Sequence, residues 1–388
     1  MTAVRWGSGA HVNHPRIEMI PAEPVDDAAA LSRVYTPGVA DDCRAIAGHS
    51  DIARRLTTRG NSVAVASDGS AVLGLGDIGA LAALPVLEGK AALLKRFAGV
   101  DGWPLCVDAR DPEEMAHCIA AVARGFGGIC LEDIAAPRCF AVERHLQDAL
   151  DIPVVHDDQH GTAIVVLAAL QNALRLTGRS AESVKTVVVG AGAAGTAIVR
   201  LLTVWGVSKI AVYDVNGLLH PDRDDVGSHD DIDGHREWLA GNTQPDPGAV
   251  SVSEALADAD VFIGVSGPGV IGAGDIAKMA DRPVIFALAN PDPEIDPEEA
   301  REHAAVVATG RSDEPNQINN VLAFPGLFRG LLDCRAQELT VAAQFAAAQV
   351  IADTVSPADL HPELIVPSVF DEKLVPAVAA AVARSCQP

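Results

Sequence analysis

The chain has 388 residues, a hydrophobic fraction of 49%, 34 glycines and a formal net charge of -23. Its length exceeds the usual size of a single hydrophobic core and favours two domains, and its composition is typical of a globular α/β protein rather than a disordered one. The excess of 52 acidic over 29 basic residues argues against nucleic acid as a partner, because a polyanion needs a basic surface. An anionic metabolite remains compatible with this charge where a metal ion or a few cations reverse the local field.

Cysteine usage and the N-terminal stretch predict a cytoplasmic protein. The seven cysteines are scattered and never spaced as C-x-x-C, so they indicate neither a disulfide framework nor a zinc knuckle. The first twenty residues lack the apolar core of a signal peptide, and no apolar run approaches the roughly 20 residues of a membrane span. We therefore expect no membrane partner.

The first part of the chain has an irregular pattern of strands. The stretch "NSVAVASDGSAVLGLGDIG" (61–79) predicts a strand, an Asp-Gly turn, a second strand and a glycine-rich entry to a helix. Its Gly74, Gly76 and Gly79 match G-x-G-x-x-G, but no acid ends a second parallel strand at the required distance. We expect a tight turn that shapes a substrate pocket. Further strands are predicted within 103–109, 127–134 and 152–158.

From Val184 onward, strand-like runs alternate with helical patterns, which is typical of a doubly wound parallel sheet. An acidic segment at 220–248 interrupts this order and is expected to be solvated. After Leu327 the pattern is mainly helical, especially within 338–355 and 373–386. We predict an α/β fold with an N-terminal substrate and metal domain (1–160) and a Rossmann-type NAD(P)-binding domain (161–388), whose helical end, from about 328, could pack back on the first domain.

The stretch "VKTVVVGAGAAGTAIVRLL" carries the second G-x-G-x-x-G match in a context that favours dinucleotide binding. Gly190, Gly192 and Gly195 follow a β-branched strand and open a helix, with Ala193 and Ala194 between the glycines. "KIAVYD" then ends in Asp214, about 20 residues on, where the fingerprint places a partner of the ribose hydroxyls. These glycines would allow the turn and the approach of the pyrophosphate to the helix N-terminus.

Two adjacent carboxylates stand between two histidines in "VVHDDQHGTA" (154–163). The pattern resembles the H-E-x-x-H zinc motif, but we expect the helix to begin only at Thr162, after Gly161, so that His156 and His160 would not share a helical face. A solvated turn is the simplest alternative. A second acid pair, Glu132 and Asp133, follows another apolar strand in "GGICLEDI". Together with Asp158 it favours an oxygen-rich magnesium or manganese site.

The order of these motifs resembles the malic enzymes of the compact bacterial type along nearly the whole chain. The resemblance rests on "VYTPGVA" (34–40), "SDGSAVLGLGDIGALAALPVLEGKAALLKRFAGVD" (67–101), "LEDI", "VVHDDQHGTA", "GAGAAG", "ALANPDPE" and "NNVLAFPGLFRG" (319–330). It implies oxidative decarboxylation of malate to pyruvate and carbon dioxide, with reduction of NAD or NADP and a requirement for Mg²⁺ or Mn²⁺. It also suggests a homodimer in which Tyr35 acts across the interface.

Residue roles can be transferred from this resemblance by motif. Tyr35 matches the general acid, Lys90 the general base and Asp157 the neighbouring acid that orients the site. Glu132, Asp133 and Asp158 match the metal ligands, Asn290 and Asn320 match side chains that hold substrate, and Ser266 and Asn290 lie in motifs on the cofactor side. As a base, Lys90 would need a lowered pKa, through burial and the nearby cation.

The sequence leaves three matters open. Longer family members carry an arginine just before "LGLGD", where this chain has Ala71 and Val72, so the cation for the substrate carboxylate is unassigned; Lys95 and Arg96 are nearby candidates. Asp214 is followed by uncharged residues, which favours NAD over NADP, although Arg223 could fold back to supply the charge that NADP needs. A malolactic-type enzyme that releases lactate and a non-catalytic dinucleotide sensor are the alternative functions.

Overall fold

The computed structural model describes residues 14–72, 74–227, 234–244 and 249–386. Parts of the acidic segment (228–233 and 245–248) and most of the N-terminal stretch considered above lie outside them. Within the described residues, no helix combines the length and the apolar character that crossing a membrane requires.

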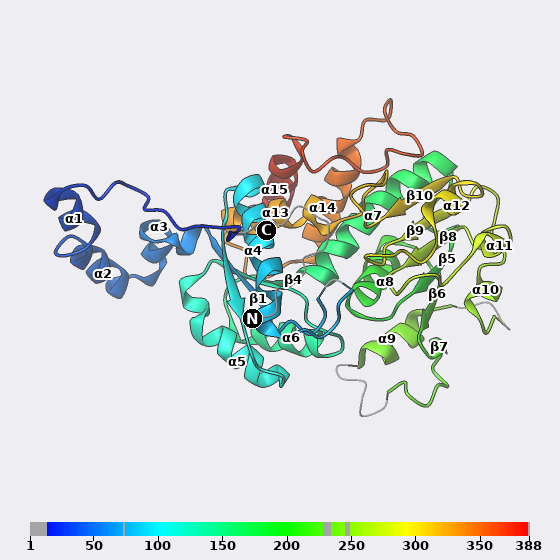
Figure 1. Ribbon diagram of the computed structural model, residues 1–388, viewed down its shortest axis with the longest axis horizontal. Helices are drawn as coiled ribbons and strands as arrows, with labels where there is room; N and C mark the ends of the chain where they lie inside the picture. The colour runs from blue at the N-terminus through cyan, green and yellow to red at the C-terminus, as the bar shows by residue number, and fades with distance from the viewer. Residues whose placement is uncertain (1–13, 73, 228–233, 245–248, 387–388) are drawn as a thin grey trace, which may run out of the picture.

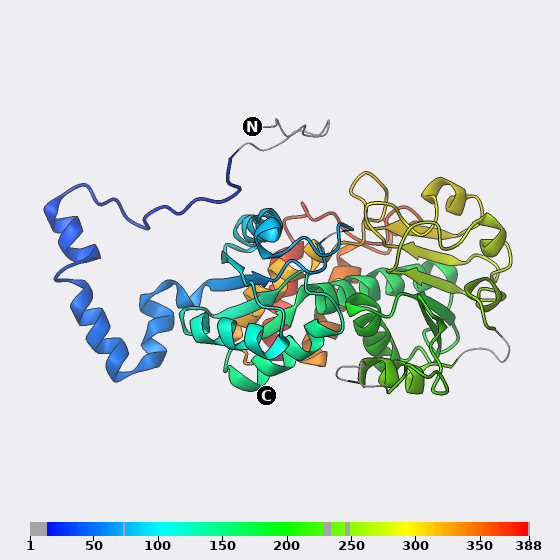
Figure 2. The same ribbon diagram turned by 60° about the horizontal axis from the view of Figure 1, so that its bottom comes forward.

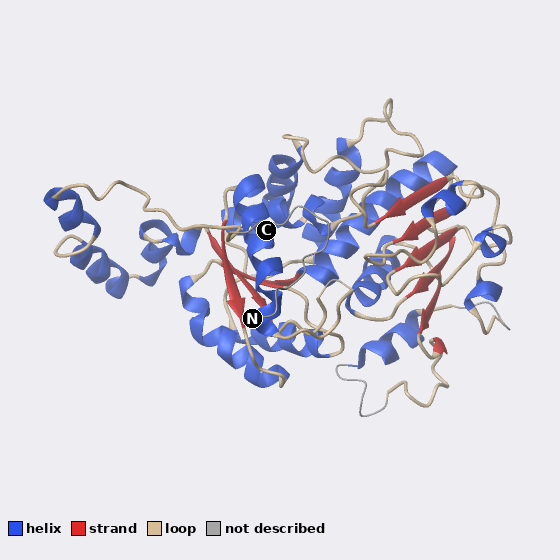
Figure 3. Ribbon diagram, in the orientation of Figure 1, coloured by secondary structure: helices blue, strands red, loops and turns tan. Residues whose placement is uncertain are grey.

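The strands form two sheets, seen as two groups of arrows in Figure 3. The first sheet has four parallel strands in the order β2-β1-β3-β4, namely β1 (Ser62–Ser67), β2 (Asp101–Cys106), β3 (Gly128–Leu131) and β4 (Val154–His156). The second has six strands in the order β10-β9-β8-β5-β6-β7, namely β5 (Lys185–Val189), β6 (Lys209–Asp214), β7 (Gly217–Leu218), β8 (Val261–Gly264), β9 (Val284–Ala287) and β10 (Val306–Thr309). Only β7 among them pairs antiparallel, with β6. The α/β class with a doubly wound second sheet is confirmed.

Helices cover both sheets. Those of the first half are α1 (Ala28–Val34), α2 (Val39–Gly48), α3 (Ala53–Leu56), α4 (Ala80–Ala98), α5 (Pro112–Val122), α6 (Arg138–Ala149) and α7 (Asp157–Thr177). Those of the second half are α8 (Ala193–Trp205), α9 (His235–Asn242), α10 (Val252–Ala255), α11 (Ala273–Ile276), α12 (Pro297–Arg301), α13 (Phe324–Cys334), α14 (Val341–Thr354) and α15 (Leu374–Ser385). The expected boundary at residue 160 falls inside α7 and stays a prediction.

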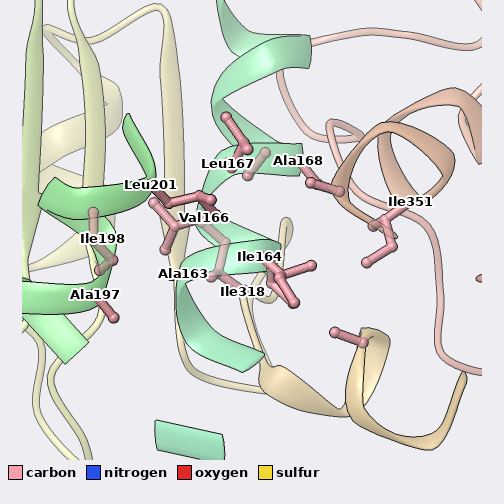
Figure 4. Packing of buried hydrophobic residues seen from close by; sticks show 14 of the residues in the cluster. Ala163, Ile164, Val166, Leu167, Ala168, Ala197, Ile198, Leu201, Ile318 and Ile351 are labelled. Carbon is pink, nitrogen blue, oxygen red and sulfur yellow. The ribbon is translucent and has the colours of Figure 1, made fainter. Parts of the chain in front are cut away.

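Helix α7 joins the two halves of the molecule. It starts directly after β4 and runs between α8 and α14, and its Val166 lies beside Leu201 of α8 (Figure 4). Its other side meets Ile351 of α14. Almost every residue of α7 from 161 to 174 is buried, so one apolar core spans both sheets and fixes their relative placement.

The C-terminal helices lie beside α4 (Figure 1). Helix α13 contacts α4 and packs closely on α15, because Gly326 and Gly330 present no side chain there: a Cβ on Gly330 would lie 2.6 Å from the carbonyl oxygen of Ala379. Leu374, Val378 and Val382 of α15 join the large core. The last helices thus support the helix that carries Lys90.

An arm formed by α1, α2 and α3 projects from the body (Figures 1 and 2). Within the described residues 14–60, Ala30 is the only buried residue. Met19, Ile20, Leu31, Val34 and Tyr35 are among the exposed large side chains of the whole chain. The arm therefore has no core of its own in a single copy of the chain.

One predicted element is absent. Between β1 and α4 the described residues form no second strand; a single bridge links Val72 to Gly76 instead. Gly69, Gly74 and Gly76 all adopt positive φ, between 67° and 99°, which is incompatible with a continuous strand. The segment is a tight glycine turn, and a Cβ on Gly74 would lie 2.4 Å from the carbonyl oxygen of Asn290.

Candidate functional site

A cleft of about 990 Å³ opens between the carboxyl ends of the two sheets. Parallel strands end at the same edge of a sheet, so the residues that follow β3 and β4 meet there, opposite those that follow β5, β8 and β9. The predicted site residues that line it are Lys90, Glu132, Asp133, Asp158, Gly192, Ala193, Ala194, Ser266, Asn290 and Asn320. The structure therefore brings the proposed metal, substrate and cofactor residues to one place.

Three carboxylates form the acidic centre of the cleft. Glu132 and Asp133 follow β3, and Asp158 lies in the first turn of α7; each offers one oxygen within 4.8 Å of the others. The Asp133 backbone adopts a φ of 53°, uncommon for a residue with a side chain, and its N–H donates to Asp158 Oδ2 at 2.8 Å. Three carboxylate oxygens this close fit a hard divalent cation such as Mg²⁺ or Mn²⁺, which would offset their mutual repulsion.

Helix α7 begins at Asp157, five residues before the predicted start at Thr162, so that expectation is wrong. Gly161, taken as a helix breaker, lies inside the helix. A Cβ there would lie 2.0 Å from Asp157 Oδ1 and 3.1 Å from Asn320 Cβ, so glycine makes room for these side chains. His156 caps the helix and His160 binds Glu143 instead of sharing a metal with it. Among the described residues, no metal-ligating group contains a histidine.

Lys90 lies on α4 and is almost fully buried. Its Nζ donates to Glu132 Oε2 at 2.6 Å and also to Asp157, and it lies 4.5 Å from the centre of the Phe324 ring. Burial is the largest single effect and lowers the pKa of Lys90, but the combined attraction of Asp157, Glu132 and other nearby acidic groups outweighs it and raises the pKa well above its usual value. The expected lowering is thus wrong for the protein alone, and a cation beside Glu132 would offset part of this attraction.

Glu143 of α6 was missed in the sequence and supports the acidic turn from behind. This buried carboxylate accepts from the His156 backbone N–H at 2.9 Å and from Gln159 Nε2 at 3.0 Å, and it pairs with His160 Nε2 at 2.9 Å. Despite burial, which raises it, the pKa of Glu143 is lowered by His160. The network fixes the first turn of α7, which carries both aspartates.

The cofactor side of the cleft is built mainly from backbone. Gly190 follows β5 with a φ of 116°, and a Cβ on Gly195 would lie 1.8 Å from the Gly190 carbonyl oxygen. The loop lies between β5 and β8, where the strand order changes direction, and opens α8 at Ala193. The neighbouring loops after β8 and β9 are joined by Glu294, also missed in the sequence. This buried carboxylate accepts from the backbone N–H groups of Ser266 at 2.8 Å and Ala289 at 3.1 Å.

Asp214 ends β6, and Arg223 has folded back on it. The guanidinium donates to both Asp214 oxygens at 2.8 Å and to Asp225 at 2.7 Å (Nε to Oδ1) and 2.5 Å (Nη2 to Oδ2). Its Nη1 also reaches the carbonyl oxygens of Gly217 at 3.2 Å and Leu218 at 3.3 Å. These hydrogen bonds hold the pKa of Asp225 far below its usual range. Arg223 therefore bridges two carboxylates at the expected ribose position, and Arg236 lies 3.6 Å from the second of them, Asp225.

Other predicted residues do not enter the cleft. Tyr35 lies on the arm, 68% exposed, and is not among the cleft residues. Neither Lys95 nor Arg96 lines the cleft: Lys95 pairs with Asp101 at 2.7 Å, and Arg96 lies over the Phe97 ring. The cleft contains instead Arg16, from the segment before the arm, which the sequence pattern did not single out because it belongs to no element.

Comparisons with known proteins point to the same family along nearly the whole chain. A family model described as "Malic enzyme, N-terminal domain" matches residues 14–115, and "Malic enzyme, NAD binding domain" matches residues 159–387. The chain is 52% identical to the NAD-dependent malic enzyme of Geobacillus stearothermophilus, over 94% of this chain and 75% of that one. It is 48% identical to the bifunctional malic/malolactic enzyme of Bacillus subtilis, over 96% and 90%. The crystal structure of the NAD-dependent malic enzyme of Thermotoga maritima superposes with a TM-score of 0.89 at 45% identity, covering 95% of this chain and 96% of that one.

Proposed function

The chain belongs to the malic enzyme family, and we infer from this that it catalyses the oxidative decarboxylation of malate to pyruvate and carbon dioxide with reduction of NAD or NADP. The observation that carries the inference is the single cleft in which Lys90 and three clustered carboxylates face the glycine loop of the second sheet. An acid–base group beside a dinucleotide loop is the arrangement that hydride transfer from a hydroxy acid needs.

We propose that Glu132, Asp133 and Asp158 hold Mg²⁺ or Mn²⁺. A divalent cation held there would polarise the oxygen on C2 of the substrate and balance the charge that develops on it during decarboxylation. Lys90, hydrogen-bonded to Asp157, can pass a proton to that buried carboxylate and then accept the proton of the substrate hydroxyl as hydride leaves C2. Asp157 is thereby the partner that adjusts the protonation of Lys90.

The amides of Asn290 and Asn320 line the same cleft and can donate to substrate oxygens without adding charge. A neutral donor suits the carboxylate that leaves as uncharged carbon dioxide, because it stabilises the reactant less than a cation would. Ser266 and the backbone of the Gly192–Ala194 turn lie on the side of the cleft where the dinucleotide would bind.

We propose that NAD is preferred over NADP. Arg223 stands where a cation for the 2′-phosphate is needed, but Asp214 and Asp225 already bind it, and Arg236, 3.6 Å from Asp225, only balances the second carboxylate. A phosphate would have to displace a carboxylate, whereas the ribose hydroxyls of NAD can bind Asp214 as donors. The kcat/KM ratio for NAD over NADP tests this, and a ratio below one would contradict it.

A homodimer is proposed from the arm. Its exposed apolar residues need a partner surface, and Tyr35 in one copy is remote from the cleft that Lys90 lines. If Tyr35 protonates the enol in the cleft of the second copy, Tyr35→Phe and Lys90→Ala variants should each be inactive and regain activity when mixed after unfolding and refolding. Failure of the mixture to recover, although each variant refolds and dimerises, would place Tyr35 outside the partner's site.

The release of pyruvate is tested with malate, Mn²⁺ and each cofactor by the absorbance of reduced nicotinamide. Malate-dependent accumulation of NADH or NADPH with equimolar pyruvate supports the proposed function. Lactate without net cofactor reduction would favour a malolactic enzyme, an activity in the name of the Bacillus subtilis relative. Cofactor binding without turnover would indicate a sensor. The free state of all seven cysteines supports action in a reducing compartment, and we propose the cytoplasm.

A further inference from the structure

The cleft is short of positive charge for the substrate it is proposed to bind. Of the described residues that line it, only Arg16 and Lys90 have a positively charged side chain. Lys90 is already committed to Glu132 and Asp157. Even with Lys90 and one divalent ion counted, the formal charge of the site is −1, because it contains four carboxylates: Glu132, Asp133, Asp157 and Asp158. A dicarboxylate would therefore enter a site that is still negative, which is unfavourable at close range.

Arg16 is held at the rim of this cleft by the helix that carries Lys90. Its backbone N–H donates to Glu88 Oε2 at 3.1 Å, and Glu88 lies on α4 two residues before Lys90. The segment then continues outward to the arm (Figure 2). Within the part of the chain that the structure describes, the Arg16 guanidinium makes no hydrogen bond or ion pair. It is thus a positioned cation whose charge is still available, unlike Lys95 on Asp101.

We propose that Arg16 binds the substrate carboxylate that is retained in the product. The inference rests on the proposed malate chemistry. A guanidinium can hold a carboxylate through two parallel hydrogen bonds, which fixes its orientation as well as its charge. The retained carboxylate keeps its charge throughout the reaction, so a cation stabilises reactant and transition state alike. On the departing carboxylate the same cation would favour the reactant, because the charge there moves away as carbon dioxide forms.

The inference is tested with Arg16→Ala and Arg16→Lys in the full-length protein, with Lys278→Ala, an exposed cation far along the second domain, as the matched control. Arg16→Ala should raise the KM for malate by roughly 10- to 100-fold, the fold change expected for a charge-assisted hydrogen bond, with a smaller effect on kcat and none on the KM for NAD. The KM of Arg16→Lys for malate should lie between those of the parent and Arg16→Ala, because lysine restores the charge but cannot form two parallel hydrogen bonds.

Oxalate separates the two carboxylates, because it resembles the planar oxygens of the product enol and lacks the carboxylate that leaves. Its inhibition constant should rise in Arg16→Ala by a factor similar to that of the malate KM. A malate KM within about twofold of the parent value would overturn the inference, as would a large effect of Lys95→Ala with none of Arg16→Ala. So would an effect on malate with oxalate inhibition unchanged, which would place Arg16 on the departing group.

Thermal stabilisation by oxalate and Mn²⁺ gives a readout that does not need turnover. If the parent protein does not oxidise malate, the proposed function fails on its own. The role of Arg16 is then tested by the thermal stabilisation that oxalate produces. Loss of this stabilisation in Arg16→Ala supports carboxylate binding by Arg16, and unchanged stabilisation overturns the inference. Since the Arg16 side chain is exposed, the substitution should leave the melting temperature without ligand unchanged.

Discussion

The carboxyl ends of the two sheets face the same cleft but are built differently. At the first sheet, the wall of the cleft is formed by ionisable side chains. Lys90 donates hydrogen bonds to Glu132 and Asp157, and Asp133 and Asp158 lie beside them. At the second sheet, glycines and backbone groups dominate, and the charged clusters around Arg223 and Arg311 lie apart from the cleft residues. Charged side chains are thus concentrated at the wall proposed to carry the chemistry, whereas the opposite wall provides a backbone surface that a dinucleotide can approach closely.

The difference also appears in what supports each end. The acidic end is held by other polar side chains, such as Glu143 beneath α7, so its geometry depends on a chain of ion pairs. The glycine end is held by close backbone approach and by Glu294, which accepts backbone N–H groups of two loops. A substitution should therefore affect chemistry at one end and cofactor affinity at the other. The following predictions test that separation.

The largest effect is expected from Asp158→Ala. Loss of one of three clustered carboxylates should abolish malate oxidation and metal-dependent decarboxylation of oxaloacetate, while the affinity for NAD, measured by fluorescence or calorimetry, stays at the parent value. Asp148→Ala, on the exposed side of α6, is the control. Decarboxylation at the parent rate would show that Asp158 is not a metal ligand, and lost NAD binding would show that the two ends are not separate.

Gly190→Ala is the reciprocal change. A Cβ at this position would lie 2.5 Å from the Val265 carbonyl oxygen on a backbone with a φ of 116°, so the loop must shift. NAD affinity and malate oxidation should fall at least tenfold, and stability by about 1–3 kcal/mol, while oxaloacetate decarboxylation is retained. Gly241→Ala, where a Cβ meets nothing within 4 Å, should be neutral. Equal loss of both activities would mean that the glycine loop also shapes the acidic end.

Glu294→Gln should have an intermediate effect. The amide keeps the shape of the side chain but places a donor where one carboxylate oxygen now accepts, so either the Ser266 or the Ala289 N–H loses its partner. We expect a rise in the KM for NAD of several-fold, a loss of stability of about 1–3 kcal/mol and little change in oxaloacetate decarboxylation. An unchanged KM for NAD with reduced stability would restrict Glu294 to a structural role.

The sequence was sufficient for most strands and for the clustered acids, because apolar runs of strand length end in polar residues that must share one edge of a sheet. It did not predict α9, whose Leu239 is buried in the core although 220–248 was expected to be solvated. It failed where a glycine had two interpretations. Gly161 suggested a helix start, yet it lies within α7. The residue there is glycine because Asp157 and Asn320 leave no room for a Cβ. Asp68 and Gly69 suggested a hairpin turn, and Gly69 does adopt positive φ, but Gly74 and Gly76 also do, and no second strand forms among the described residues before α4.

Other parts of the site were beyond reach because they depend on contacts between distant segments. Arg16 meets α4 through Glu88, 72 residues away along the chain, and no local pattern marks either residue. Glu294 reaches Ser266 across 28 residues. The direction of the Lys90 pKa shift depends on how closely Asp157 and Glu132 approach, which spacing in the sequence does not determine. Conversely, Arg223 was expected to be able to fold back toward the position of the NADP phosphate, but its pairing with Asp214 and Asp225 was not predicted.

The smallest effect is expected at that second carboxylate, in the exposed cluster of the glycine end. Asp225→Ala should leave Arg223 on Asp214 with two of its five N–H donors, the one on Nε and one on Nη2, free to meet a 2′-phosphate. Because Asp225 is partly exposed, solvent screens the gain, and we expect kcat/KM for NADP to rise by roughly three- to tenfold with NAD nearly unchanged. High salt should reduce the gain, and adding Arg223→Ala should remove it. Asp222→Ala, an exposed acid that contacts His220 rather than Arg223, controls for net charge alone. If it raises NADP use equally, the general field of this acidic protein, and not the cluster, sets the preference.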